Sequence, residues 1–472
     1  MLPFLLSSLL AALPAATAPG HLYTLDELTQ IALVNQPRLK AAAAEEQAAR
    51  ERKGEAEAPN YPSVDLYAEY VRATYNNSVS SYFAVPWLAS IGGYSSTDLN
   101  RLPSFQGVAP PLPSQSFTAS NDSYFLGAMA KYDVLDFGRT ASGIQGAEAG
   151  IDLARSDAIV AAEAVVFGVR RAYYELLAAE ALLTTAKKVL AEAQEHLAWA
   201  HEAVKDGLRA PVDEIQAKSD VTRADLMLVQ ARAGVRVSRV RILRAIGLEE
   251  PRHIEVAPSP DAVDIGETEA SLLDRAYRER PDLAALAART RFTEARLANA
   301  NANFNPVLNA EANLFAAGSD PNLPWTQPGL SAVPDWDVGL ILSFPLFEGF
   351  LLTHQAREAQ ADVNVAKQHE EDLKLTVLKQ VREAFVDFKA ALEAVVAADA
   401  NKAAAAEEMK VVSGRYNNGL SSILDLIIAQ ATSVTADQEA VRARYQAGIA
   451  RSFLDLAVGE PPPRLAAAQR SP

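Results

Sequence analysis

The sequence predicts a mainly α-helical chain, duplicated in tandem, in which each copy joins two β-strands to a long helical hairpin. Residues 25–66 match residues 269–310 at a constant offset of 244, and residues 132–251 match residues 344–463 at an offset of 212. Constant offsets held over tens of residues indicate a tandem duplication. Both copies contain segments in which apolar and polar residues alternate, which predicts strands. Both also contain long proline-free runs of helix-forming residues, which predict the hairpins.

Length and composition narrow the class of protein. A chain of 472 residues is too long for one compact core, so we expect several domains or an elongated repeated body. The net charge of −15 argues against a nucleic-acid partner, which would need a basic face. Cysteine is absent, and the six histidines do not have the spacing of metal ligands. No phosphate-binding glycine loop or serine-nucleophile motif occurs, so we expect neither an enzyme nor a bound cofactor or metal.

Residues 1–18 are predicted to form a secretory signal peptide. Residues 2–18 are almost all apolar or small, and the run is too short for a comfortable membrane-spanning helix. The alternative is an apolar N-terminus that is retained. No other stretch contains 18 consecutive apolar residues, so a membrane role would require strands that close a β-barrel.

The first repeat is expected to span residues 19–248. A short helix should end before Pro37, because proline disfavours the helical conformation in the residue that precedes it. After a second helix, strands are expected at about 62–72 and 123–134, followed by a helical hairpin at about 138–246. One face of each strand is apolar and the other is largely polar, which suits a membrane barrel and a soluble antiparallel sheet equally well.

The second repeat, residues 270–460, follows an acidic linker at 249–269 and has the same order of elements. Its expected elements are strands at about 307–315 and 336–344 and a helical hairpin at about 349–458. The hairpin helices are longer than any globular core, so they should pack side by side as coiled coils. Residues 461–472 are expected to form an irregular tail.

Five segments resemble the TolC family of outer-membrane efflux proteins. They are Ala-Leu-Val-Asn-Gln-Pro-Arg-Leu (32–39), Asn-Tyr-Pro-Ser-Val (60–64), Phe-Pro-Leu-Phe-Glu-Gly (344–349), Arg-Tyr-Asn-Asn-Gly-Leu (415–420) and Leu-Asp-Leu (424–426). The resemblance covers essentially the whole mature chain, and the order, spacing and duplication of the motifs are more specific than any single motif. Because the chain has no cysteine, it resembles the non-lipidated branch of the family.

The resemblance implies a homotrimer in the cell outer membrane. Four strands cannot close a barrel, whose minimum is about eight, whereas three chains of four strands would form a 12-stranded barrel. The long helices would form a trimeric α-barrel, a tunnel in the periplasm. The implied function is a passive exit duct of a tripartite efflux or type I secretion system. The implied partners are outer-membrane lipid, a periplasmic adaptor (membrane fusion protein) and an inner-membrane pump. The alternative is a soluble or peripheral coiled-coil scaffold without a pore.

The resemblance also implies roles for the turns of the two helical hairpins. Gly207-Leu208 and Gly419-Leu420 correspond to the tips at which the periplasmic adaptor docks in this family. Glycine is also the residue that most often ends a helix, so each glycine could be a helix cap, a docking residue or both.

Three residues correspond to a gate at the periplasmic tip, namely Asp425, Asp213 and Tyr416. Three copies of Asp425 would form an acidic ring in which mutual repulsion raises each pKa and cations bind. The alternative for Asp425 is a carboxylate that stabilises the start of a helix. Asp213 would accept a hydrogen bond from Tyr416 in the closed state, the alternative for Tyr416 being ordinary packing. Two positions differ from relatives: Ser421 replaces a basic residue, and Ile428 replaces a second acid.

Overall fold

The computed structural model describes residues 21–74, 120–249, 254–320 and 335–460. The expected signal peptide, the expected tail and most of the loop between the strands of each pair lie outside the described residues. The described residues divide into a helical unit, formed by residues 21–53, 145–249, 254–297 and 357–460, and a unit that contains the sheet. Among the described residues, no helix combines the length and the apolar character that a membrane crossing requires.

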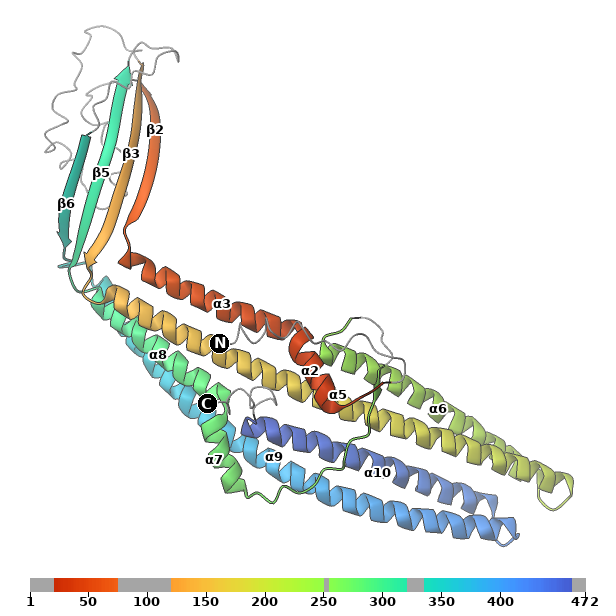
Figure 1. Ribbon diagram of the computed structural model, residues 1–472. Coiled ribbons are helices and arrows are strands. Elements are labelled where there is room, and N and C mark those ends of the chain that lie inside the picture. The colour runs from red at the N-terminus through yellow and green to blue at the C-terminus, as the bar shows by residue number, and fades with distance from the viewer. Residues whose placement is uncertain (1–20, 75–119, 250–253, 321–334, 461–472) are drawn as a thin grey trace. The chain divides into compact units, whose positions relative to one another are not determined.

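Two long helical hairpins dominate the helical unit (Figure 1). They consist of α5 (Arg139–Lys205) with α6 (Pro211–Ile246), and of α9 (Leu351–Asn417) with α10 (Ile423–Val458). Helices α5 and α9 each contain 67 residues, and α6 and α10 each contain 36. A 67-residue helix is roughly 100 Å long at 1.5 Å per residue. The equal lengths follow from the duplication, and the mainly helical character is as the sequence predicts.

Each repeat opens with two shorter helices. They are α2 (Leu25–Asn35) and α3 (Pro37–Glu57) in the first repeat, and α7 (Glu269–Glu279) and α8 (Pro281–Ala302) in the second. Gln36 and Arg280, the residues before the two prolines, have extended backbone conformations that separate the helices. A single turn of 3-10 helix, η2 (Ala58–Asn60), follows α3.

The core of the helical unit consists of two hydrophobic clusters, one in each repeat. Residues that correspond in the two repeats are buried in both clusters: Leu28 with Leu272, Val169 with Val381, Ile242 with Leu454 and Ile246 with Val458. In each cluster the short helix α2 or α7 packs against the long hairpin of its own repeat. Burying one such side chain stabilises the fold by about 2 kcal/mol.

Glycine permits the close approach of α2 and α7 to the ends of the hairpins. Gly247 and Gly459 end α6 and α10 with φ values of 75° and 77°, in the left-handed region that favours glycine. A Cβ atom at Gly247 would lie 3.0 Å from backbone atoms of Gln36, and one at Gly459 would lie 2.9 Å from Arg280 Cα. Both glycines are therefore required by backbone conformation and by packing.

A short parallel pair joins the N-terminal segment to the region between the repeats. Strand β1 (Leu22–Tyr23) pairs with β4 (Glu255–Val256), and the Ala257 amide donates to the Tyr23 carbonyl at 2.9 Å. The region 249–269, expected to be a linker only, therefore contains a strand. Two-residue strands are too short to show alternation, which is why the sequence did not predict this pair.

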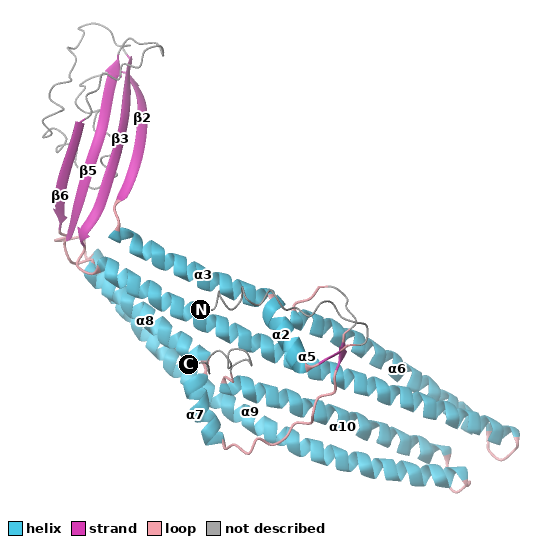
Figure 2. Ribbon diagram, viewed as in Figure 1, coloured by secondary structure: helices cyan, strands magenta, loops and turns pink. Residues whose placement is uncertain are grey.

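The second unit contains one antiparallel sheet, shown in magenta in Figure 2. Its strands are β2 (Ser63–Thr74), β3 (Ser120–Leu135), β5 (Val307–Asp320) and β6 (Asp335–Ser343), in the order β2-β3-β5-β6. The strands lie within a few residues of the alternating segments in the sequence. The pairing of β3 with β5 joins the two repeats in the middle of the sheet.

The two faces of this sheet differ in polarity. The register places Val64, Ala130, Ala312 and Val338 in one row across the sheet, and Val64 and Val338 are each 70% exposed. On the other face, Asn313 Nδ2 donates to the Asp337 carboxylate at 2.9 Å. Lys131 Nζ lies 3.8 Å from Glu311 Oε1 on that same face. A single chain therefore exposes an apolar face of the sheet and carries polar side chains on the other.

Candidate functional site

The turn of the first hairpin ends α5 with a left-handed glycine. Gly207 has a φ of 74°, its amide donates to the Val204 carbonyl at 3.0 Å, and the Leu208 amide donates to the Ala203 carbonyl at 2.9 Å. This pair of bonds satisfies carbonyls that the end of the helix leaves without partners. A Cβ atom at Gly207 would meet no described atom within 4 Å, so the backbone conformation alone favours glycine here.

The turn of the second hairpin repeats this geometry. Gly419 has a φ of 73°, its amide donates to the Tyr416 carbonyl at 3.0 Å, and the Leu420 amide donates to the Arg415 carbonyl at 2.8 Å. The helix-cap interpretation of both glycines is therefore observed. The docking interpretation concerns a partner and is taken up below.

Exposed apolar side chains begin at each turn and continue along the helix that follows. Leu208 and Leu420 are 76% and 69% exposed. Further exposed apolar residues follow at helical spacing: Val212 and Ile215 on α6, and Leu424 and Ile428 on α10. We call these two sets, each with its leucine, the apolar stripes of the tip.

Asp425 forms a capping box with Ser422 at the start of α10. The Ser422 amide donates to Asp425 Oδ2 at 2.9 Å, the Ser421 hydroxyl donates to the same oxygen at 3.0 Å, and the Asp425 amide donates to Ser422 Oγ at 3.1 Å. These hydrogen bonds, that from the Ser422 backbone first, hold the pKa of Asp425 below its ordinary value. In one chain Asp425 thus stabilises a helix start, and the expected rise in pKa would have to come from other copies.

Asp213 and Tyr416 are both buried near the tip, with residue exposures of 8% and 1%. Tyr416 Oη has no hydrogen-bond partner among the described residues. The predicted hydrogen bond between Tyr416 and Asp213 is therefore not formed in this structure. Burial raises the pKa of Tyr416, and the negative charge of Asp213 raises it further.

Arg209, a residue that the sequence did not single out, contacts both Tyr416 and Asp213. Its Nη2 donates to the Tyr416 carbonyl at 2.8 Å, and its Nη1 donates to the Ser421 carbonyl at 3.5 Å. The guanidinium carbon lies 4.5 Å from the centre of the Tyr416 ring and 5.8 Å from that of Trp199. Asp213 Oδ2 is 4.0 Å from Nη1. The sequence contained one local signal, the spacing of four residues between Arg209 and Asp213.

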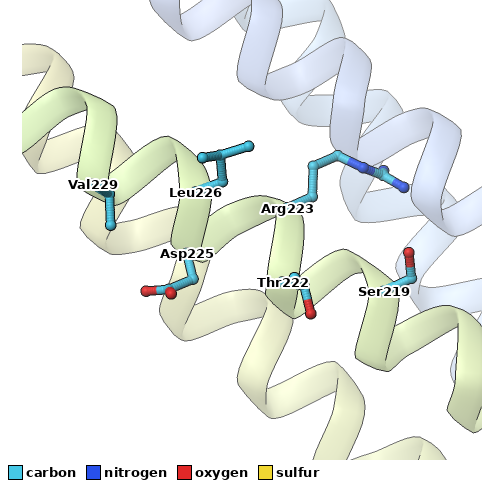
Figure 3. Close-up of a pocket in the computed structure, with 6 residues that line it drawn as sticks. All are labelled: Ser219, Thr222, Arg223, Asp225, Leu226 and Val229. Atoms are coloured by element: carbon cyan, nitrogen blue, oxygen red, sulfur yellow. The ribbon is translucent and has the colours of Figure 1, made fainter.

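No group of three or more His, Asp or Glu side chains in the described part of the chain could hold a metal ion. His201 instead contacts the exposed Glu214 carboxylate at 2.9 Å. A surface hollow of about 590 Å³ lies along α6, lined by Ser219, Thr222, Arg223, Asp225, Leu226 and Val229 (Figure 3). Because one helix supplies its whole lining, the hollow does not bring groups from different elements together.

The chain combines a sheet that has an exposed apolar face with duplicated long helical hairpins. Residues 28–248 and 272–460 match the outer membrane efflux protein family, and the chain belongs to that family. The resemblance seen in the sequence is confirmed, and the protein is located in the outer membrane.

Similar proteins cover most of the chain. Outer membrane protein TolC of Escherichia coli K12 is 23% identical over 453 residues, which cover 94% of this chain and 83% of TolC. The pyoverdine export outer membrane protein OpmQ of Pseudomonas aeruginosa is 25% identical over 438 residues, covering 90% and 83%. The Campylobacter jejuni CmeC outer membrane channel has the same fold, with a TM-score of 0.74, 16% identity, and coverage of 98% and 94%.

Proposed function

We propose that the chain forms a homotrimeric, passive exit duct for efflux or type I secretion. The observation that carries the proposal is the four-stranded sheet with one exposed apolar face. Four strands cannot close a barrel, but three copies would supply a 12-stranded barrel. Its apolar face, with Leu66 at 79% and Leu340 at 70% exposure, would meet lipid. The polar face, with Asn313 and Asp337, would line the lumen.

The helical hairpins would continue this duct as a tunnel in the periplasm. Exposed apolar side chains occur along the lengths of α6 and α9, among them Leu226, Val240, Val386 and Val396. In a single chain these side chains face water at a cost in free energy, so their exposure supports lateral packing against other helices. Neighbouring copies in a trimer would supply those helices.

The two tips would serve for docking and gating. The apolar stripes at Leu208 and Leu420 would take the helical hairpin of a periplasmic adaptor, through which an inner-membrane pump supplies the energy. Three copies of Asp425 would surround the threefold axis, and the buried residues Asp213 and Tyr416 would stabilise the closed tip. Each chain carries a net charge of −15, so a lumen lined by three chains should favour cations.

A planar-bilayer recording tests this function. The detergent-purified protein, with its trimeric state verified by native mass spectrometry, should give small, stable, cation-selective current steps. Asp425→Asn should reduce the cation selectivity, whereas substitution of the exposed Glu195 on α5 by glutamine should leave it unchanged. Anion selectivity would contradict the proposed lumen charge. A protein that carbonate washes release from membranes, and that gives no current as a trimer, would instead be a peripheral coiled-coil scaffold.

A further inference from the structure

We propose that Arg209 is the positioning residue that fastens the two hairpin tips of one chain together and so holds the tip closed. The contacts that join the tips lie within one chain, whereas the effect of these contacts on a gate depends on the proposed duct. Arg209 lies in the turn between α5 and α6, whereas Tyr416 and Ser421, whose carbonyls it contacts, lie at the turn between α9 and α10. One side chain therefore bridges the two repeats.

The guanidinium of Arg209 lies at a helix end, where a positive charge is favourable. Tyr416 belongs to the last turn of α9, which ends at Asn417, and the carbonyls at the end of a helix carry partial negative charge. The hydrogen bond of 2.8 Å from Arg209 Nη2 to the Tyr416 carbonyl is therefore charge-assisted. The Arg209 side chain is only 17% exposed, so water screens this interaction weakly.

The same guanidinium also makes a cation–π contact. It lies 4.5 Å from the Tyr416 ring centre, and the Tyr416 and Trp199 rings are themselves 4.9 Å apart. Trp199 belongs to α5 and Tyr416 to α9, so this pair of rings, tilted by 57°, also joins the two repeats. A planar fork can stack on a ring and donate to two carbonyls at once, whereas the point charge of a lysine cannot.

The bridge is placed where its loss would loosen the contact between the tips and leave the rest of the chain joined. The two hairpins are also linked by Arg170 and Asp455 at 2.8 Å, but Asp455 lies in the last turn of α10, at the opposite end from the tip. Loss of the Arg209 contacts would leave the Trp199–Tyr416 ring contact at the tip, so the tips would separate more readily about hairpins that stay joined by Gln438 to Met227 and by Arg170 to Asp455.

The test compares Arg209→Ala and Arg209→Lys with Arg223→Ala, a matched control whose arginine is 63% exposed on α6. All variants are first verified as folded trimers. Both Arg209 variants should raise single-channel conductance several-fold, and the control should not. Wild-type conductance in Arg209→Ala would overturn the proposal. Wild-type conductance in Arg209→Lys would overturn the role of the planar guanidinium. If Arg209→Ala does not fold, Tyr416→Leu, which removes the ring but keeps the carbonyl, should show a smaller rise, and no rise would count against the proposal.

A second measurement separates failure of the bridge from failure of the duct. Hydrogen–deuterium exchange of the purified trimers needs no pore. In Arg209→Ala, amides of residues 203–213 and 416–425 should exchange faster than in the wild type, with no such change in the control. Trimers that conduct no current would refute the proposed duct but would leave the Arg209 bridge unaffected. Unchanged exchange in both tips would refute the bridge, whatever the conductance.

Discussion

Replacing Glu163 with glutamine should make the stability of the protein less dependent on pH. Glu163 lies on α5 with 8% exposure. Burial, reinforced by the negative charge of Asp282 and opposed by Arg280, raises the pKa of Glu163 from 4.5 to about 8. Arg170, Asp455 and Glu460 line the same small cavity as Glu163. Glutamine keeps the shape of the side chain and cannot ionise.

The sign and size of the effect follow from proton binding. Between pH 4.5 and about 8, the folded chain keeps a proton on Glu163 that the unfolded chain has released. The free energy of unfolding therefore falls as pH rises through this range. A shift of this size corresponds to at most about 5 kcal/mol, at about 1.4 kcal/mol for each pH unit. Above pH 8, Glu163→Gln should be the more stable protein.

Thermal unfolding followed by circular dichroism measures this effect. Melting temperatures of the wild-type and Glu163→Gln proteins are compared at several values between about pH 5 and pH 9. The advantage of the variant should grow with pH. A residual slope should remain in both proteins, because burial also raises the pKa of Glu460. Glu195→Gln, at an exposed position of the same helix, should follow the wild-type curve. Parallel curves for wild type and Glu163→Gln would refute the reasoning.

Further predictions concern glycines and helix starts. Gly419→Ala should cost about 1 kcal/mol for a left-handed residue, whereas Gly459→Ala should cost more, because its Cβ would also meet Arg280; equal losses of melting temperature would contradict this. Ser422→Ala should cost about 1 kcal/mol through loss of the cap of α10, and an unchanged melting temperature would argue against that cap. In the dissociated single chain, where no other copy of Asp425 is near, Asp425→Asn should lose stability above pH 3.8, and the difference from wild type should vanish as pH falls through the lowered folded pKa; a difference that persists in more acidic solution would count against the lowered pKa.

Local patterns in the sequence were sufficient to locate most elements of the fold. Alternation located the strands of the sheet, and the proline-free runs located the hairpins. Glycine in each long helical run located both turns at Gly207 and Gly419, since a left-handed helix end is a local requirement. The parallel pair of β1 with β4 could not be found in this way, because its strands have two residues each.

Contacts between distant segments were beyond the reach of these patterns. Arg209 and the Tyr416 carbonyl are 207 residues apart in the chain, and no periodicity connects them. The resemblance implies a hydrogen bond from the Tyr416 hydroxyl to Asp213, whereas in the structure the carbonyl and the ring of Tyr416 contact Arg209. Which atoms of a residue make a contact depends on side-chain packing, and that is set by the whole tip.

The order of strands has a consequence for the ancestry of the protein. Inside the chain, the second strand of the first repeat pairs with the first strand of the second repeat, β3 with β5. If three sheets close into a ring, β6 of one chain meets β2 of the next, which joins the second strand of one repeat to the first strand of another. The strand pairing between repeats would then be the same within a chain and between chains. Six copies of an unduplicated ancestor could therefore have formed the same ring. Fusion of two copies would have allowed each half to acquire its own residues. Gln36 and Arg280, which correspond in the two repeats, are an example. Their different side chains donate to the corresponding carbonyls of Ala245 and Ala457.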